Sequence, residues 1–177
     1  FHEPMAPDSW RKGIATLPID YSIQDLSHRL RTDADRIINM SHTDADYIIN
    51  NLMHDRRLRR INEASQQINE KIYEQSKMWL ERGKIVGLVG GDQSTAYGHI
   101  KAVAEHHDNL GILHIDSGLD LRANYHGFNL SSDSVMHNVL NDIPNVKSFV
   151  GVGVRAFSPY EWERAEADER VKLFTGQ

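Results

Sequence analysis

The chain has 177 residues, of which 40% are hydrophobic and 25% charged, a composition typical of a globular domain rather than a disordered segment. Its formal net charge of −5 argues against a surface for nucleic acid or anionic lipid, so no nucleic-acid partner is expected. The sequence has no cysteine, which excludes a disulfide scaffold, a thiolate metal site and a cysteine nucleophile. Its longest apolar stretches are too short to span a bilayer, so no direct membrane span is expected.

The first part of the chain is predicted to be an irregular arm, residues 1–21, followed by helices. Ser22 is the expected N-cap of a helix over 22–39, and a second helix is expected over 41–54. The longest helix is predicted over 57–82, where apolar residues recur every three or four positions and Gly83 follows at the C-terminal end. Four arginines at the start of this helix are interpreted as a solvated face: Arg56, Arg57, Arg59 and Arg60.

Short apolar runs then alternate with helical segments. The expected strands are 84–89, 109–115, 148–154 and 171–174, and the expected helices are 95–107, 132–141 and 159–170. Strands that alternate with helices predict βαβ units and an α/β fold with a mainly parallel sheet. We therefore divide the chain into an N-terminal arm with packing helices, 1–56, and the first βαβ units of a domain, 57–177.

Two of the predicted strands lead into loops with polar side chains. V-G-G-D-Q-S-T occupies 89–95, and H-I-D-S-G-L-D occupies 114–120. In open α/β sheets, ligands bind beyond the carboxyl ends of the strands, where both loops begin. Alternate residues of an extended segment share a face, so Asp116 and Asp120 are expected to point the same way, with Gly118 between them. With a histidine between them, two such carboxylates would suit a divalent ion such as Mn²⁺, but here the middle residue is glycine and only the carboxylates remain.

Four blocks of the sequence together resemble the ureohydrolase family of arginase, agmatinase and formimidoylglutamase. They are G-G-D-Q-S at 90–94, D-S-G-L-D-L-R at 116–122, G-F-N-L-S-S-D-S at 127–134 and G-V-G-V-R at 151–155. The corresponding family blocks are G-G-D-H-S, D-A-H-x-D, a Ser-His block and x-V-G-I-R, in the same order. The resemblance implies a three-layer α/β/α fold, of which this chain holds the N-terminal part, and assembly into trimers or hexamers. It also implies hydrolysis of guanidino or formimino groups by a binuclear manganese centre, in which a metal-bound water becomes the nucleophile.

The chain departs from the family pattern at the expected metal ligands. The first ligand histidine is replaced by Gln93 and the second by Gly118, whereas Asp116 and Asp120 remain as remnant ligands. A later pair of family aspartates is expected beyond Gln177. The resemblance assigns four residues to a remnant of the substrate pocket: Asp92, His126, Asn129 and Ser132.

Two histidines are candidates to replace the lost ligands. His126 follows Asp120 in the same loop and is the better substitute by position. His114 shares the parity of Asp116 but lies inside a predicted strand, which favours a core or surface histidine. A solvated or structural histidine remains the alternative for both.

Three hypotheses about function follow. The first is an inactive or weakened ureohydrolase with a structural, assembly or regulatory role, in a homo- or hetero-oligomer or a larger complex. It needs no cofactor, and Mn²⁺ is the expected metal if a site survives. The second is an active metal-dependent hydrolase of C–N bonds in guanidino or formimino compounds, with an altered centre. The third is a small-molecule sensor. We expect an intracellular location, in the cytoplasm or an organelle matrix such as the mitochondrion.

Overall fold

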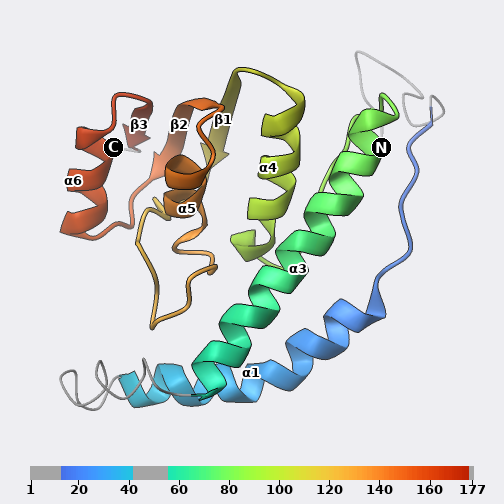
Figure 1. Ribbon diagram of the computed structural model, residues 1–177. Helices are drawn as coiled ribbons and strands as arrows, with labels where there is room; N and C mark the ends of the chain where they lie inside the picture. The colour runs from blue at the N-terminus through green and yellow to red at the C-terminus, as the bar shows by residue number, and fades with distance from the viewer. Residues whose placement is uncertain (1–12, 42–55, 176–177) are drawn as a thin grey trace, which may run out of the picture.

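The computed structural model describes residues 13–41 and 56–175 (Figure 1). The predicted helix over 41–54 therefore lies almost wholly outside the described residues. No helix in the described ranges combines the length and the apolar character needed to cross a membrane.

Two long helices precede the sheet. Helix α1, Tyr21–Ser41, begins at a different cap from the one predicted. The Asp20 carboxylate accepts hydrogen bonds from the backbone N–H and the hydroxyl of Ser22, so Asp20 takes the capping role that the sequence pattern assigned to Ser22. Near its other end, Ile37 is fully buried against Leu58 and Phe128, which ties α1 to helix α3 and to a distant loop.

Helix α3, Arg56–Glu81, matches the longest predicted helix. Gly83 follows it with a φ of 70°, a left-handed conformation that glycine adopts without strain. The Gly83 N–H donates to Leu80 O at 2.8 Å and the Lys84 N–H donates to Trp79 O at 3.0 Å. These bonds close the helix C-terminus, as predicted from the position of the glycine.

Helix α3 packs closely on helix α4, Ala96–His106, and this contact positions the first loop. The buried Asn69 side chain donates to Ser94 O and accepts from the Gly98 N–H, both at 3.0 Å. A Cβ at Gly98 would lie 2.0 Å from Asn69 O, so only glycine permits this approach of the two helices. A short 3-10 helix, η2 (Gln93–Thr95), is thereby fixed at the start of α4.

Three parallel strands form one sheet in the order β1-β2-β3. They are β1 (Leu110–Ile115), β2 (Val146–Val154) and β3 (Val171–Thr175), with helices α5 (Val135–Asp142) and α6 (Pro159–Ala167) between them. This βαβαβ order confirms the predicted α/β fold with a parallel sheet. The predicted strand over 84–89 is wrong: residues 84–90 form no strand, and Ile85 and Val89 are fully exposed.

The hydrophobic core lies on one face of the sheet. Strand residues such as Ile112 and Phe149 pack there against α4, α5 and α6, which share a single buried cluster. The opposite face carries Leu113, Ile115 and Phe174, which are 65%, 74% and 61% exposed. Within the described residues the sheet thus has a layer of helices, α4, α5 and α6, on one face only, which is part of the expected three-layer fold.

Candidate metal centre

The second loop leaves the carboxyl end of β1 and continues beside the end of β2. The Asp116 N–H donates to Val152 O at 3.2 Å, and Ser117 O accepts from the N–H groups of Arg155 and Ala156, both at 2.9 Å. The Leu119 N–H returns a bond to Ala156 O at 3.2 Å. These backbone bonds fix the loop that carries the predicted carboxylates.

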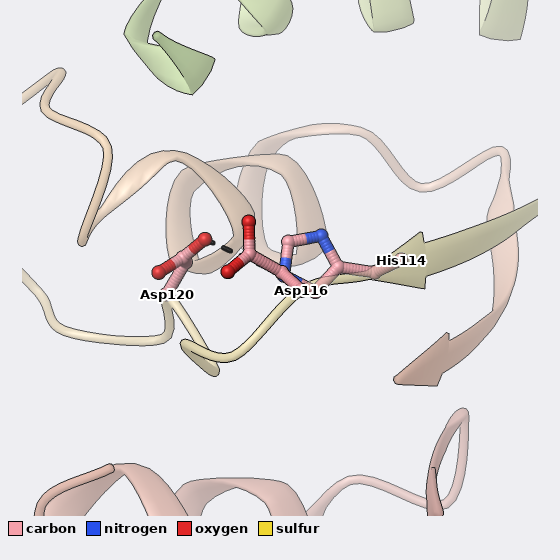
Figure 2. Close-up of side chains that lie close together, drawn as sticks. All are labelled: His114, Asp116 and Asp120. Carbon is pink, nitrogen blue, oxygen red and sulfur yellow. Dashed lines mark ion pairs between the residues drawn. The ribbon is translucent and has the colours of Figure 1, made fainter. Parts of the chain in front are cut away.

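Three side chains from the end of β1 and this loop converge. His114, Asp116 and Asp120 each offer one ligand atom, and these atoms all lie within 4.8 Å of one another. Figure 2 shows the two carboxyl groups and the imidazole turned toward one another. They form the one group of three or more potential metal ligands within the described ranges, 13–41 and 56–175.

His114 sits deep in this cluster, with its side chain only 5% exposed. Its Nε2 lies 3.2 Å from Gly118 O and 3.4 Å from Asp120 Oδ2, and the imidazole packs 5.4 Å from the Phe149 ring. Burial lowers the pKa of His114, but the neighbouring Asp120 carboxylate and Gly118 carbonyl outweigh it, and the net shift is upward. The pocket around Nε2 therefore favours a positive charge.

Asp120 is unusual in both backbone and side chain. It is a non-glycine residue with a φ of 59°, a left-handed conformation that carries strain, and it is only 7% exposed. Its Oδ2 is buried and accepts no hydrogen bond. Its ion-pair neighbour is His114 Nε2 at 3.4 Å, which is longer than a good hydrogen bond and leaves this buried oxygen incompletely satisfied.

Gly118 makes this placement possible because it has no side chain. A Cβ at this position would lie 2.6 Å from Asp120 Oδ1, well inside van der Waals contact. The Gly118 N–H meanwhile donates to Asp116 Oδ1 at 3.0 Å. The family pattern has a histidine at position 118. In this chain the space that a side chain at 118 would enter holds the Asp120 carboxylate.

Gln93 reaches the same cluster from the first loop. Its side-chain amide donates a hydrogen bond to Asp116 Oδ2, while the preceding Asp92 caps η2 by accepting from the Ser94 N–H at 2.8 Å. The Gly118 N–H is the main reason that the pKa of Asp116 lies below its usual value. Partial burial opposes that shift, and the Gln93 amide reinforces it. The Asp116 carboxylate is consequently held by one donor from each loop.

The remaining predicted pocket residues are spread over other contacts. Asn129 donates its N–H to Asn62 Oδ1 at 3.0 Å, and Ser132 donates its hydroxyl to Asp133 at 3.3 Å. His126 has a φ of 52° and packs against the Tyr125 ring, with centroids 4.1 Å apart, and it is not a member of the three-residue cluster. Asp92 lines an open hollow of about 490 Å³ formed by residues of the first loop.

Sequence reasoning missed the anchor of the second loop, Glu161. This side chain is almost fully buried and accepts from the Leu121 N–H at 3.2 Å, Arg122 Nε at 3.1 Å and the Ser158 N–H at 2.8 Å. The sequence did carry a signal, because Ser158 and Glu161 have the spacing of a capping box. Arg122 therefore pairs with a structural carboxylate rather than with Asp116 or Asp120.

Comparison with known proteins places these features in context. Residues 4–177 match the sequence pattern of one family, described as the Arginase family. The arginase of Bacillus caldovelox is 29% identical over 135 residues, which cover 68% of this chain and 44% of that protein. The arginase of Bacillus subtilis is 32% identical over 120 residues, which cover 60% of this chain and 40% of that protein.

The fold has solved counterparts as well. The crystal structure of formimidoylglutamase from Bacillus subtilis matches with a TM-score of 0.52 and 20% identity, covering 64% of this chain and 35% of that one. At this identity the likeness concerns the fold alone. The chain spans less than half the length of these relatives.

Proposed function

This chain belongs to the arginase family, and we propose that it is a member whose hydrolytic chemistry is lost or weakened and whose fold serves a structural, assembly or regulatory role. The proposal rests on the residues that stand at the two positions where the family pattern has ligand histidines, Gln93 and Gly118. Gln93 uses its amide to bind Asp116, and Gly118 leaves a space into which Asp120 turns.

The residues present do not fit two manganese ions. Replacing imidazoles by an amide at Gln93 and by no side chain at Gly118 removes a donor from each of the two family blocks. Changes to groups that merely orient a metal ligand cost about 10–100-fold in affinity or activity, so losing two ligands should cost more. No hydrolytic step through a binuclear centre is therefore assigned to this chain.

Turnover measurements test the proposal directly. The purified protein, supplied with Mn²⁺, is incubated with a panel of guanidino and formimino compounds, and released urea and ammonia are measured. The arginase of Bacillus subtilis, assayed in parallel, provides the positive control. We expect no release, or release far slower than that by the control arginase, and turnover of any one compound at a rate comparable to that of the control would overturn the proposal.

One observation favours a second candidate, a C–N hydrolase with an altered centre. His114, Asp116 and Asp120 still gather ligand atoms within 4.8 Å, so a single metal could activate water there. The same substrate panel, run with Asp116→Asn beside the unchanged protein, separates the candidates. Activity that disappears in Asp116→Asn supports the altered centre, whereas no activity in either protein removes it.

The assembly role is supported separately by the exposed face of the sheet, opposite the hydrophobic core. Leu113, Ile115 and Phe174 expose large apolar side chains there, and exposed apolar patches commonly mark contact surfaces. Light scattering of the purified protein across a range of concentrations measures its mass. We expect a homo-oligomer whose association Leu113→Asp weakens. A monomer at every concentration would restrict the assembly role to a heteromeric complex.

A further inference from the structure

We propose that His114, Asp116 and Asp120 form a binding site for one divalent transition-metal cation, with Zn²⁺ as the best fit, and that His114 is a ligand in place of the histidines lost from the two loops. Figure 2 shows the juxtaposition on which this rests. The site differs from a family-type centre in its ligands and in holding one ion rather than two. It does not depend on whether the protein is a hydrolase.

The first argument is the unsatisfied oxygen of Asp120. Asp120 is only 7% exposed, and its Oδ2 has no hydrogen-bond donor, although it points into the cluster toward His114. Buried polar atoms in native proteins nearly always have a partner, and a cation bound between Oδ2 and Nε2 would supply one. The left-handed backbone at Asp120 holds the carboxylate in this inward position.

The second argument is charge. Asp116 and Asp120 bring two carboxylates together, and no lysine or arginine of the described residues forms an ion pair with either. Only the His114 imidazole, 3.4 Å from Asp120 Oδ2, can offset this charge from within the cluster. Nearby carboxylates repel one another unless a cation or a proton lies between them.

The third argument is geometry and ligand type. Around a tetrahedral Zn²⁺ with bonds of about 2.0–2.2 Å, ligand atoms lie about 3.3–3.6 Å apart. His114 Nε2 and Asp120 Oδ2 are already 3.4 Å apart, and all three ligand atoms lie within 4.8 Å of one another, so binding requires a modest inward movement of the side chains. One imidazole with two carboxylates suits Zn²⁺ better than Mg²⁺ or Ca²⁺, which prefer oxygen alone. The Gly118 N–H and the Gln93 amide hold Asp116 in place from outside the site, as partners of metal ligands usually do.

Gly118 gives the proposal a structural control. Because a Cβ at Gly118 would lie 2.6 Å from Asp120 Oδ1, Gly118→Ala should displace that carboxylate and weaken binding. Gly91 lies in the first loop, has no atom within 4 Å of an added Cβ, and does not have a positive φ. Gly91→Ala is therefore the matched variant that should leave the site intact.

Metal titration tests the inference. The protein is stripped with a chelator and titrated with Zn²⁺, Mn²⁺ and Mg²⁺ in separate calorimetric runs, with the bound metal counted by elemental analysis. We expect one Zn²⁺ per chain, and more than about tenfold weaker binding in His114→Gln, Asp116→Asn and Gly118→Ala. His107→Asn, which removes an exposed histidine, and Gly91→Ala should bind Zn²⁺ like the unchanged protein.

The possible outcomes are distinguishable. The absorption spectrum of Co²⁺ bound to the unchanged protein reports imidazole and carboxylate ligation without any variant, so a variant that fails to fold does not end the test. No saturable Zn²⁺ or Co²⁺ binding would mean that His114 and Asp120 form an ion pair alone, and the inference would be wrong. Zn²⁺ binding lost in His107→Asn but kept in Asp116→Asn would equally overturn it.

Discussion

The two loops that carry the altered histidine positions differ in what stands where the family pattern has a histidine. In the first loop, Gln93 keeps a polar side chain that still reaches Asp116. In the second loop, Gly118 removes the side chain altogether, and the Asp120 carboxylate fills the space. The first loop thus keeps a side chain that binds Asp116, whereas in the second loop a neighbouring carboxylate occupies the space beside the glycine.

The loops also differ in how firmly they are held. The second loop is bonded to the end of β2 and to Glu161. The first loop is held by Asn69 at η2, but it follows an exposed segment, 84–90, that belongs to no strand. Changes to the second loop should therefore affect the stability of the whole fold more than changes to the first. The following predictions test this difference.

The largest effect is expected for Glu161→Gln. The change removes a buried charge that accepts from Leu121, Arg122 and Ser158, and breaking such a group costs about 3 kcal/mol of unfolding free energy. Urea denaturation measures the loss. Glu163→Gln, an exposed change on the same helix, is the control and should cost almost nothing; equal midpoints for both variants would contradict the account.

A smaller effect is expected for Gly118→Ala. The added Cβ meets the buried Asp120 carboxylate, and forcing an extra group into a packed position typically costs about 1–3 kcal/mol. The matched Gly91→Ala should be neutral or slightly stabilising, because the alanine has open space and reduces the freedom of the unfolded chain. Thermal unfolding of both variants measures the difference, and the reverse order would show that the second loop is not tightly packed.

Gln93→Ala should cost less again. It removes one partly exposed hydrogen bond to Asp116, for which about 1 kcal/mol is expected. Gln67→Ala, an exposed glutamine on α3, serves as the control in the same denaturation experiment. A loss larger than that of Gly118→Ala would invert the proposed ranking of the two loops.

The contribution of Glu161 should depend on pH. Burial raises its pKa, but hydrogen bonds from Ser158 and the Arg122 guanidinium outweigh this, so the pKa in the folded protein is lowered. A lowered carboxyl pKa gives stability that is present above the unfolded value and lost as pH falls through the folded value. The difference in unfolding free energy between the unchanged protein and Glu161→Gln should therefore shrink below about pH 4. A constant difference down to about pH 2 would contradict it.

Much of the fold could be predicted from the sequence because its signals are local. The spacing of apolar residues and Gly83 gave α3, and the alternation of apolar runs with helices gave the parallel sheet. The run at 84–89 has the same composition as the real strands but forms none, because a strand needs a neighbour to bond. In the part of the chain that the structure describes, it pairs with none of the three strands.

The candidate site was less accessible to sequence reasoning. Asp116 and Asp120 were identified from their motif, but nothing in the sequence indicates that Asp120 adopts a left-handed backbone or that its carboxylate turns into the space at Gly118. The sequence signal for His114 is that it lies two residues before Asp116, so both share a face of an extended segment. Its position in a strand favoured a core histidine, and it is in fact both buried and turned toward Asp120.

The central claim is that the two altered histidine positions no longer support a pair of manganese ions. The most direct test is the number of Mn²⁺ ions bound per chain after equilibrium dialysis, with electron paramagnetic resonance to detect coupling between ions. The account predicts no more than one Mn²⁺ per chain and a spectrum of isolated ions. Two Mn²⁺ per chain with a spin-coupled spectrum would contradict it.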